Sequence, residues 1–371
     1  MSHVAVIVYF ADDPTRTYQL LQWLPVLEVL DEAQPVALVL RDDESAAIVR
    51  ERTRLPVAVA AFTELTELYA ELDAKVVLYC NNSPLNFQSL LHSRMLHVHI
   101  NHGESDKQSM ASNNAKAYDR VFVAGEAAVQ RYAAELLELD PAKLVRIGRP
   151  QLDLSPPALL EPSARRTVLY APTWEGDAEY NDYTSVDTLG VEIVRGILAV
   201  PDVRLVYKPH PKLATSGTPA IRDAHHALLQ IVAAAGAEHC AVTSGDILAV
   251  LPACDAMVTD VSSVGLDWLY LRTECPLFIT DRHHDADRLR REVPVSRCAD
   301  VLDDVDAAGV AAIIAARLDH DEHHLARVAM RHHYFDDVAV GESTARFIEE
   351  VAALVALRDQ LVGVPGAAII A

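Results

Sequence analysis

Histidine and glycine follow an apolar segment in the stretch LHVHINHGESDK, where the chain has His102 and Gly103. Glycine lets the backbone turn closely around a ligand, and an imidazole with an ordinary pKa of about 6.5 can act as a general base. His97 and His99 alternate with apolar residues, so we interpret them as packed or hydrogen-bonded side chains. A zinc site built from these histidines is disfavoured, because alternate strand positions do not converge readily with a loop residue.

A second cation-bearing segment is YKPHPK, residues 207–212. A proline on each side of His210 ends the preceding apolar strand and stiffens the loop. Lys208 and His210 could neutralise phosphate oxygens with little reorganisation. From this stretch alone, a rigid solvent-exposed loop is an equal alternative.

Further along, VTDVSSVGLDWLYL places four polar side chains between an apolar strand and a helical pattern: Thr259, Asp260, Ser262 and Ser263. A serine at a helix N-cap, with free N–H groups behind it, can seat an anion. A plain capping motif is the alternative, but two hydroxyls beside an aspartate at a strand end favour phosphate binding. Thr173 in YAPTWEGD offers one more hydroxyl, as compatible with a turn as with a site.

Other clusters are interpreted as solvated. The stretch DRHHDADRLRR contains a DAD triplet, and HDEHH and RHHYF gather five histidines. We attribute these to exposed charged segments and helix faces, so we expect no metal site and no cofactor. The chain has no GxGxxG, GxxxxGK[ST] or GxSxG pattern. The sequence therefore gives no sign of a dinucleotide-binding fingerprint, a P-loop or a nucleophile elbow.

The elements that must position these residues alternate between short apolar strands and longer helical patterns, which indicates parallel α/β sheets. A proline-rich stretch interrupts the alternation. We therefore predict an α/β protein with two Rossmann-like domains facing across a cleft, whose carboxyl strand ends hold the chemistry. We predict a first domain over residues 1–150 and a linker over 151–166. A second domain follows over 167–335, and a C-terminal helix with a tail over 336–371.

The composition excludes several classes of function. The 371 residues carry a formal net charge of −21, which argues against broad binding to nucleic acid or anionic lipid. Five scattered cysteines without a CxxC indicate reduced thiols. The N-terminal residues lack a signal-peptide pattern, and no apolar run approaches the roughly 20 residues of a membrane helix. We expect a cytoplasmic protein, with peripheral docking at the inner membrane face through an acceptor or a partner left open.

Six motifs, taken in order and together with Asp267, resemble the CDP-glycerol glycerophosphotransferase family of teichoic acid polymerases and primases. The motifs are NHGESDK, YDRVFVAG, IGRPQLD, LYAPTWEG, YKPHP and DILAVLPACDAMVTDVSS, and they cover roughly residues 95–280. The resemblance implies a GT-B fold, with the donor nucleotide held by the second domain and the acceptor approaching from the first. C-terminal helices are then expected to pack back on the first domain.

The resemblance also implies roles for individual residues. The proposed base falls on His102, the second essential histidine on His210, and the lysine of the first motif on Lys107. The hydroxyl-rich loop falls on the four polar residues named above, so that these, Lys208 and Thr173 are expected to hold the donor pyrophosphate and nucleotide. Gly103, Lys107 and Asp267 are assigned to the acceptor or to support. Val261 stands where an aromatic residue is usual, and Gln151 where the family often has arginine.

Three functions follow from these observations. The first is transfer of glycerol phosphate, or a related alditol phosphate, from a CDP-linked donor to a saccharide or polyol-phosphate hydroxyl in teichoic-acid- or capsule-like polymer synthesis. The second is a GT-B glycosyltransferase that uses a UDP- or GDP-sugar. The third is a catalytically idle domain that binds a polymer or a partner protein. The two histidines and the paired serines argue against the third, the same loops could hold UDP or GDP as the second requires, and the family resemblance makes the first the leading hypothesis.

Overall fold

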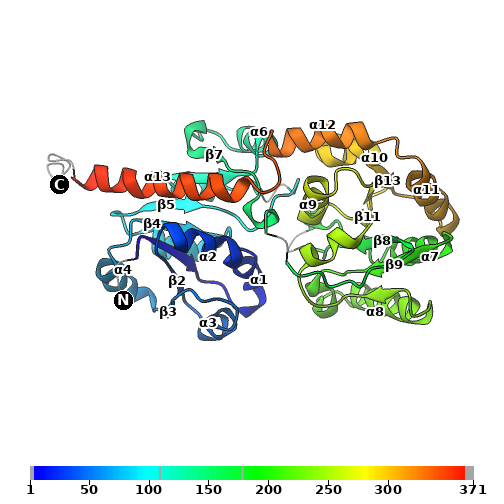
Figure 1. Ribbon diagram of the computed structural model, residues 1–371, viewed down its shortest axis with the longest axis horizontal. Coiled ribbons are helices and arrows are strands. Elements are labelled where there is room, and N and C mark those ends of the chain that lie inside the picture. Colours follow the sequence, from blue (N-terminus) through cyan, green and yellow to red (C-terminus); the bar gives the residue numbers. More distant parts are fainter. Residues whose placement is uncertain (1–3, 108–109, 155, 177–178, 364–371) are drawn as a thin grey trace. The chain divides into compact units, whose positions relative to one another are not determined.

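A computed structural model of the chain describes residues 4–107, 110–154, 156–176 and 179–363. The chain forms two compact units, each of which is assembled from separate parts of the sequence (Figure 1). The first unit comprises Met1–Gly103, Ala111–Leu154 and Tyr334–Ala371. The second comprises Glu104–Met110 and Ser155–His333.

The described residues of the first unit form a seven-stranded sheet in the order β3-β2-β1-β4-β5-β6-β7. Every neighbouring pair is parallel. The central strands are apolar on both faces, as is typical of a parallel sheet covered by helices. The strands are β1 (Val6–Phe10), β2 (Val36–Leu40), β3 (Val57–Val59), β4 (Val76–Tyr79), β5 (Leu96–His99), β6 (Arg120–Val123) and β7 (Leu144–Arg146).

Helices in the first unit follow the strands in alternation. They are α1 (Tyr18–Leu21), α2 (Leu24–Ala33), α3 (Asp43–Arg50), α4 (Leu65–Leu72), α5 (Phe87–Leu90), α6 (Glu126–Glu135) and α13 (Ser343–Gly363). Local sequence explains individual ends: Asp42 caps α3 because its side chain accepts a hydrogen bond from Ser45 N. Short 3₁₀ turns lie in several connections, among them η1 (Pro14–Arg16), η3 (Pro84–Asn86) and η7 (Pro150–Leu152).

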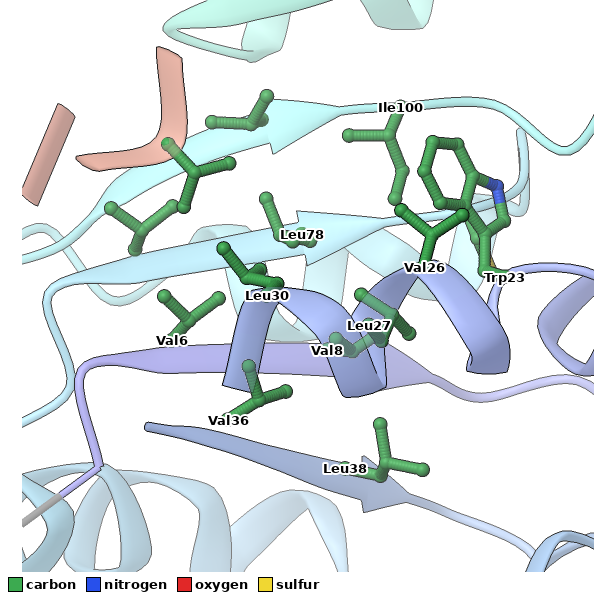
Figure 2. Close-up of a cluster of buried hydrophobic side chains, with 14 of the residues drawn as sticks. Val6, Val8, Trp23, Val26, Leu27, Leu30, Val36, Leu38, Leu78 and Ile100 are labelled. Carbon is green, nitrogen blue, oxygen red and sulfur yellow. The ribbon is translucent and has the colours of Figure 1, made fainter. Parts of the chain in front are cut away.

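The C-terminal helix α13 packs on the first unit, where it contacts α2, β4 and β5. Phe347 and Val351 of α13 belong to the same buried cluster as the α2 and strand side chains drawn in Figure 2. The Trp23 and Phe347 rings lie 5.2 Å apart. Gly148 has φ +75, and a Cβ there would stand 2.2 Å from Ser343 Oγ, so only glycine lets α13 start so close to this turn.

The described residues of the second unit form a six-stranded parallel sheet in the order β10-β9-β8-β11-β12-β13. Its strands are β8 (Arg166–Ala171), β9 (Val203–Tyr207), β10 (Cys240–Ala241), β11 (Ala256–Thr259), β12 (Leu277–Thr280) and β13 (Asp300–Leu302). Its helices are α7 (Gly190–Ala199), α8 (Pro219–Ala234), α9 (Ser263–Leu271), α10 (Ala286–Glu292) and α11 (Ala307–Asp319), followed by α12 (His324–Phe335), which leads into the first unit.

Both units are therefore α/β layers around a parallel sheet, and the predicted pair of Rossmann-like folds is confirmed. The strand order reverses between β1 and β4 in one sheet and between β8 and β11 in the other. The packing of α13 on the first unit agrees with the expectation for the C-terminal helices. Within the part of the chain that the structure describes, no helix is long and apolar enough to cross a membrane.

Candidate active site

His102 lies shortly after the end of β5, and a tight turn fixes its backbone. Asn101 has φ +52, in the left-handed region that asparagine tolerates better than most residues. Its Oδ1 accepts a hydrogen bond from His102 N at 2.9 Å. Its carbonyl oxygen accepts another from Trp23 Nε1 at 2.5 Å. Because Trp23 is anchored in the core, the turn that carries His102 is tied to the rigid part of the first unit.

Two side chains from other segments hold His102 more directly. Gln151, in the turn η7, donates from Nε2 to the His102 carbonyl oxygen at 3.4 Å. The Tyr18 ring meets the His102 ring edge-on, with centroids 6.2 Å apart. His102 Nδ1 is buried and has no hydrogen-bond partner among the described residues. Gly103 follows and is buried.

The surroundings of His102 keep its imidazole neutral. Burial lowers the pKa of His102 to about 4, and the charges of Arg149, His99 and Arg16 act in the same direction. A neutral ring at pH 7 can accept a proton, as a general base must. An anion bound beside the arginines would offset their charge and raise the pKa of His102 toward neutrality.

The two strand histidines have different environments. His97 Nδ1 lies 2.8 Å from Tyr79 Oη, and its Nε2 lies 2.9 Å from the carbonyl oxygen of His92. His99 stacks on the Tyr118 ring at 5.1 Å. The prediction that these histidines are packed or hydrogen-bonded is therefore confirmed for both, through different contacts.

The second unit places His210 where β9 ends. Its backbone N donates to the Pro172 carbonyl oxygen at 3.1 Å, and its Nδ1 accepts from Lys212 N at 3.2 Å. In the neutral ring this contact puts the proton on Nε2, which becomes a hydrogen-bond donor. The His210 ring also stacks on Trp174 at 6.1 Å, with an interplanar angle of 28°, and Lys212 Nζ lies 3.7 Å from the centroid of that indole.

Lys208 precedes this turn and is buried, with 5% of its surface exposed. Its Nζ donates to the Ser244 carbonyl oxygen at 3.4 Å. Burial lowers the pKa of Lys208, while the nearby charge of Asp246 opposes the shift. The structure thus brings Lys208 and His210 to one strand end, as the sequence predicts.

Asp260 joins the ends of three strands. Its Oδ2 accepts from Thr173 N at 2.7 Å, and its Oδ1 accepts from Thr280 Oγ1 at 2.6 Å. Burial raises the pKa of Asp260 to about 6, against the lowering effect of these hydrogen bonds and of Ser185. Thr259 Oγ1 is buried too and donates to the Ala171 carbonyl oxygen at 2.7 Å. Thr259 and Asp260 are therefore placed to hold the loops, and their side chains face other protein groups.

The tandem serines stand at the start of α9. Ser262 occupies the N-cap position in an extended conformation, yet its side chain makes no capping hydrogen bond. Its Oγ is buried without a partner among the described residues. The first-turn N–H groups of α9, which begins at Ser263, lie behind this hydroxyl. An uncommitted hydroxyl and a helix N-terminus together suit an anion.

The remaining predicted residues lie in the second unit. Lys107 Nζ stands 5.8 Å from the centroid of the Tyr183 ring, and its backbone N donates to Ser105 Oγ. Asp267 lies on α9 and is buried. Among the residues that the structure describes, no group of three or more His, Cys, Asp or Glu is placed to hold a metal ion.

Sequence reasoning assigned no role to several residues that surround the two histidines: Trp23, Tyr18, Arg149, Gln151 and Trp174. Arg149, Gln151 and Trp174 lie inside motifs quoted above, and Gln151 is noted there only as a departure from the family pattern. Trp23 and Tyr18 lie in a region without any recognisable motif. Their contacts with the His102 turn appear only once the chain has folded.

Comparison with known proteins places this geometry in context. Residues 91–284, slightly more than half of the chain, match the model of a family described as CDP-Glycerol:Poly(glycerophosphate) glycerophosphotransferase. No curated protein sequence gives a significant match.

Solved structures share the fold at low sequence identity. The wall teichoic acid polymerase TagF is 14% identical, with 95% of this chain and 90% of that chain covered and a TM-score of 0.60. A putative UDP-N-acetylglucosamine 2-epimerase from Listeria monocytogenes is 14% identical, with 98% of each chain covered and a TM-score of 0.62. A glycosyltransferase from Rickettsia africae is 11% identical, with 96% and 99% covered and a TM-score of 0.54.

Proposed function

This chain belongs to the CDP-glycerol:poly(glycerophosphate) glycerophosphotransferase family, and on that premise we propose which reaction it catalyses. It transfers glycerol phosphate, or a related alditol phosphate, from a CDP-linked donor to an acceptor hydroxyl in the synthesis of a cell-surface polymer. The observation that carries the proposal is the family match, which spans both the His102 and the His210 segments. TagF has been solved as a histidine-to-asparagine variant soaked with CDPG.

His102 acts as the base on the acceptor side, in the first unit. The acceptor oxygen attacks the β-phosphorus of the donor pyrophosphate while its proton passes to the neutral imidazole of His102. The bond between that phosphorus and the bridging oxygen breaks, and CMP leaves with the electron pair. The lowered pKa of His102 leaves its ring deprotonated at neutral pH, and the negative charge of the bound phosphates would raise this pKa toward the range in which a general base works best.

The second unit binds the donor. His210 donates from Nε2 to a phosphate oxygen, and Lys208 contributes a positive charge close by. Ser262 Oγ and the N–H groups that begin at Ser263 take the other oxygens at the N-terminus of α9. As in other phosphoryl transfers, this arrangement works by positioning and by stabilising charge.

Other predicted residues act indirectly in this proposal. Thr173 and Asp260 hold the strand-end loops together through the hydrogen bond between them, and Thr259 ties β11 to β8. Lys107 and Asp267 are proposed as supporting residues. Gly103 allows the chain to turn closely past the acceptor.

The test is CMP release by the purified chain, with CDP-glycerol and CDP-ribitol as donors and UDP- and GDP-sugars compared in parallel. His102→Ala and His210→Ala should each lower the rate by about 10²–10³, the usual effect of losing one preorganised group. Ser262→Ala should raise the KM for the donor and leave the KM for the acceptor unchanged. Asn113→Ala, at an exposed asparagine, serves as the control.

Two results would contradict the proposal. One is turnover of UDP- or GDP-sugars without turnover of a CDP-alditol, which would identify the chain as a glycosyltransferase. The other is full activity in both histidine variants, which would remove their assigned roles. Mass analysis of the product identifies the group that was transferred.

A further inference from the structure

The reversal of strand order between β1 and β4 marks a second place where a ligand can bind. Ligands of open α/β sheets lie outside the carboxyl ends of the strands at such a reversal. Here the chain after β1 carries Asp12, and the chain after β4 carries Asn81 and Asn86. None of these residues belongs to a motif identified in the sequence.

The side chains that follow β1 and β4, at the carboxyl edge of the first sheet, hold one another in fixed orientations. Asp12 Oδ2 accepts from Asn81 Nδ2 at 2.7 Å, and Asp12 Oδ1 accepts from Ser83 Oγ at 2.8 Å. Asn86 Nδ2 donates to the Asn81 carbonyl oxygen at 2.8 Å and to Tyr118 Oη at 3.1 Å. Because both amide nitrogens are engaged in this way, the positions of the two amide oxygens are determined.

Those oxygens and a neighbouring imidazole are buried without hydrogen bonds. Asn81, Asn86 and His99 expose 2%, 0% and 4% of their surfaces. The Oδ1 atoms of both asparagines and both ring nitrogens of His99 meet no hydrogen-bond partner among the described residues. The Asn81 backbone lies near enough to the His99 ring to oppose the lowering of its pKa, but outside hydrogen-bonding geometry. Buried polar atoms in proteins are almost always hydrogen-bonded, either to protein or to water, so this concentration at one strand-end edge calls for hydroxyl groups as partners, which water or a hydroxylated ligand can supply.

The position of His99 connects this edge with the proposed base. Its ring stacks on Tyr118, which accepts the hydrogen bond from Asn86. His102 follows three residues later, and the two rings are close enough that a charge on His99 lowers the pKa of His102. Asp12 is only partly buried, so its carboxylate is the part of the cluster nearest to solvent.

We propose that Asp12, Asn81, Asn86 and His99 form a polyol subsite in the first unit, which takes the uncharged, hydroxyl-bearing part of the acceptor beside His102. The amide oxygens and the Asp12 carboxylate accept hydrogen bonds from hydroxyl groups. The neutral His99 ring supplies one donor and one acceptor. A carboxylate and two carbonyl dipoles would repel a phosphate, so the subsite selects hydroxyl groups over anions.

That the ligand is the acceptor rests on the proposed function. The His99→Phe variant tests whether the subsite binds the acceptor. Phenylalanine keeps an aromatic ring against Tyr118 and removes both nitrogens. The KM for the acceptor should rise about tenfold, as expected for the loss of a hydrogen bond, with the KM for the donor unchanged. The thermal unfolding midpoint should not fall, because the exchange removes two buried nitrogens that make no hydrogen bond with the described residues.

His97→Phe is the matched control, since it makes the same exchange on the same strand. Both nitrogens of His97 are bonded within the protein, so this variant should lose stability and keep its KM for the acceptor. If His99→Phe behaves like His97→Phe, the cluster is a structural network and the subsite does not exist.

Direct binding separates this proposal from the proposed reaction. Saturation-transfer NMR on the whole chain should show contact with glycerol and ribitol, lost in His99→Phe and retained in His97→Phe. Inorganic phosphate should not compete. If His99→Phe does not fold, Asp12→Asn replaces it as the test, since Asp12 is more exposed. This variant should weaken the polyol signal. An absent polyol signal in the native chain, or an equal one in His99→Phe, overturns the subsite. Polyol binding without turnover of CDP-glycerol would leave the subsite standing and refute the reaction.

Discussion

The left-handed turn at Asn101 allows the positioning of His102 to be measured. Asn101→Gly and Asn101→Ala both remove the oxygen that accepts the hydrogen bond from His102 N. Only alanine must also be forced to a positive φ, because glycine adopts φ +52 without a steric penalty. The difference between the two variants therefore isolates the backbone conformation from the hydrogen bond.

The expected magnitudes follow from these two contributions. Loss of the hydrogen bond costs about 0.5–1.5 kcal/mol of unfolding free energy. The left-handed conformation costs a residue with a Cβ about 1–2 kcal/mol, of which about 0.4–1 kcal/mol is offset because alanine is less free than glycine when unfolded. We expect Asn101→Gly to lose about 1 kcal/mol and Asn101→Ala about 2 kcal/mol.

Activity should separate the variants more clearly than stability. Alanine can escape the penalty by rotating toward negative φ, which would move the His102 ring. A displacement of about 1 Å can lower a rate about 10²-fold. We therefore expect CMP release to fall at least about tenfold further in Asn101→Ala than in Asn101→Gly.

Local stability is best measured by hydrogen exchange of the peptide that covers residues 96–107, since a chain of two units need not unfold in one transition. Asp202 provides a control, because it also has a positive φ, +54, and lies in the exposed connection before β9. The same pair of exchanges there should reproduce the stability difference without affecting the rate. Equal rates in the two Asn101 variants would refute the argument that the turn positions His102.

Two further predictions concern pH and the docking of α13. The pKa values of His99 and His102, lowered to about 4, mean that the folded chain binds fewer protons than the unfolded chain between about pH 4 and 6.5, so stability rises with pH in this window. The raised pKa of Asp260, about 6, acts in the opposite sense. Denaturant titrations between about pH 5 and 7 should show that the free energy of unfolding rises with pH, and that it rises more steeply in Asp260→Asn. A free energy of unfolding that falls with pH in this window would contradict the prediction. Gly148→Ala should lower the thermal midpoint by more than Gly341→Ala, since both positions have a positive φ but only a Cβ at Gly148 would clash with α13; equal midpoints in the two variants would show that the close approach is not needed.

Much of the fold could be predicted from the sequence because the relevant signals are local. Runs such as VIVYF and VALVL became buried parallel strands, and the helical pattern of residues 219–235 became α8. The helical pattern of residues 186–199 forms a helix only from Gly190 onward. The stretch ILAVLPAC, apolar enough for a regular element, forms two 3₁₀ turns instead, with Pro252 at the start of the second.

The candidate site was predictable only in part. The strand-end rule placed His102 and His210 correctly at the carboxyl edges of two sheets. It could not show that Asp260 and Thr259 face the protein, because polar residues at a strand end serve a ligand and a neighbouring loop equally well. Nor could it reveal the contact between Trp23 and Asn101, whose partners lie far apart in the sequence and meet only through tertiary packing.

The return of α13 to the first unit has a consequence for the order in which the chain folds. On the ribosome, β1 to β7 emerge before the second unit, while the helix that completes their core emerges after it. The second unit can therefore finish folding while the first still exposes the apolar surface that Phe347 and Val351 will cover. Nascent chains stopped before α13 should be vulnerable to proteases and bound by chaperones, and the turn that carries His102 should gain its rigid support only when this helix packs.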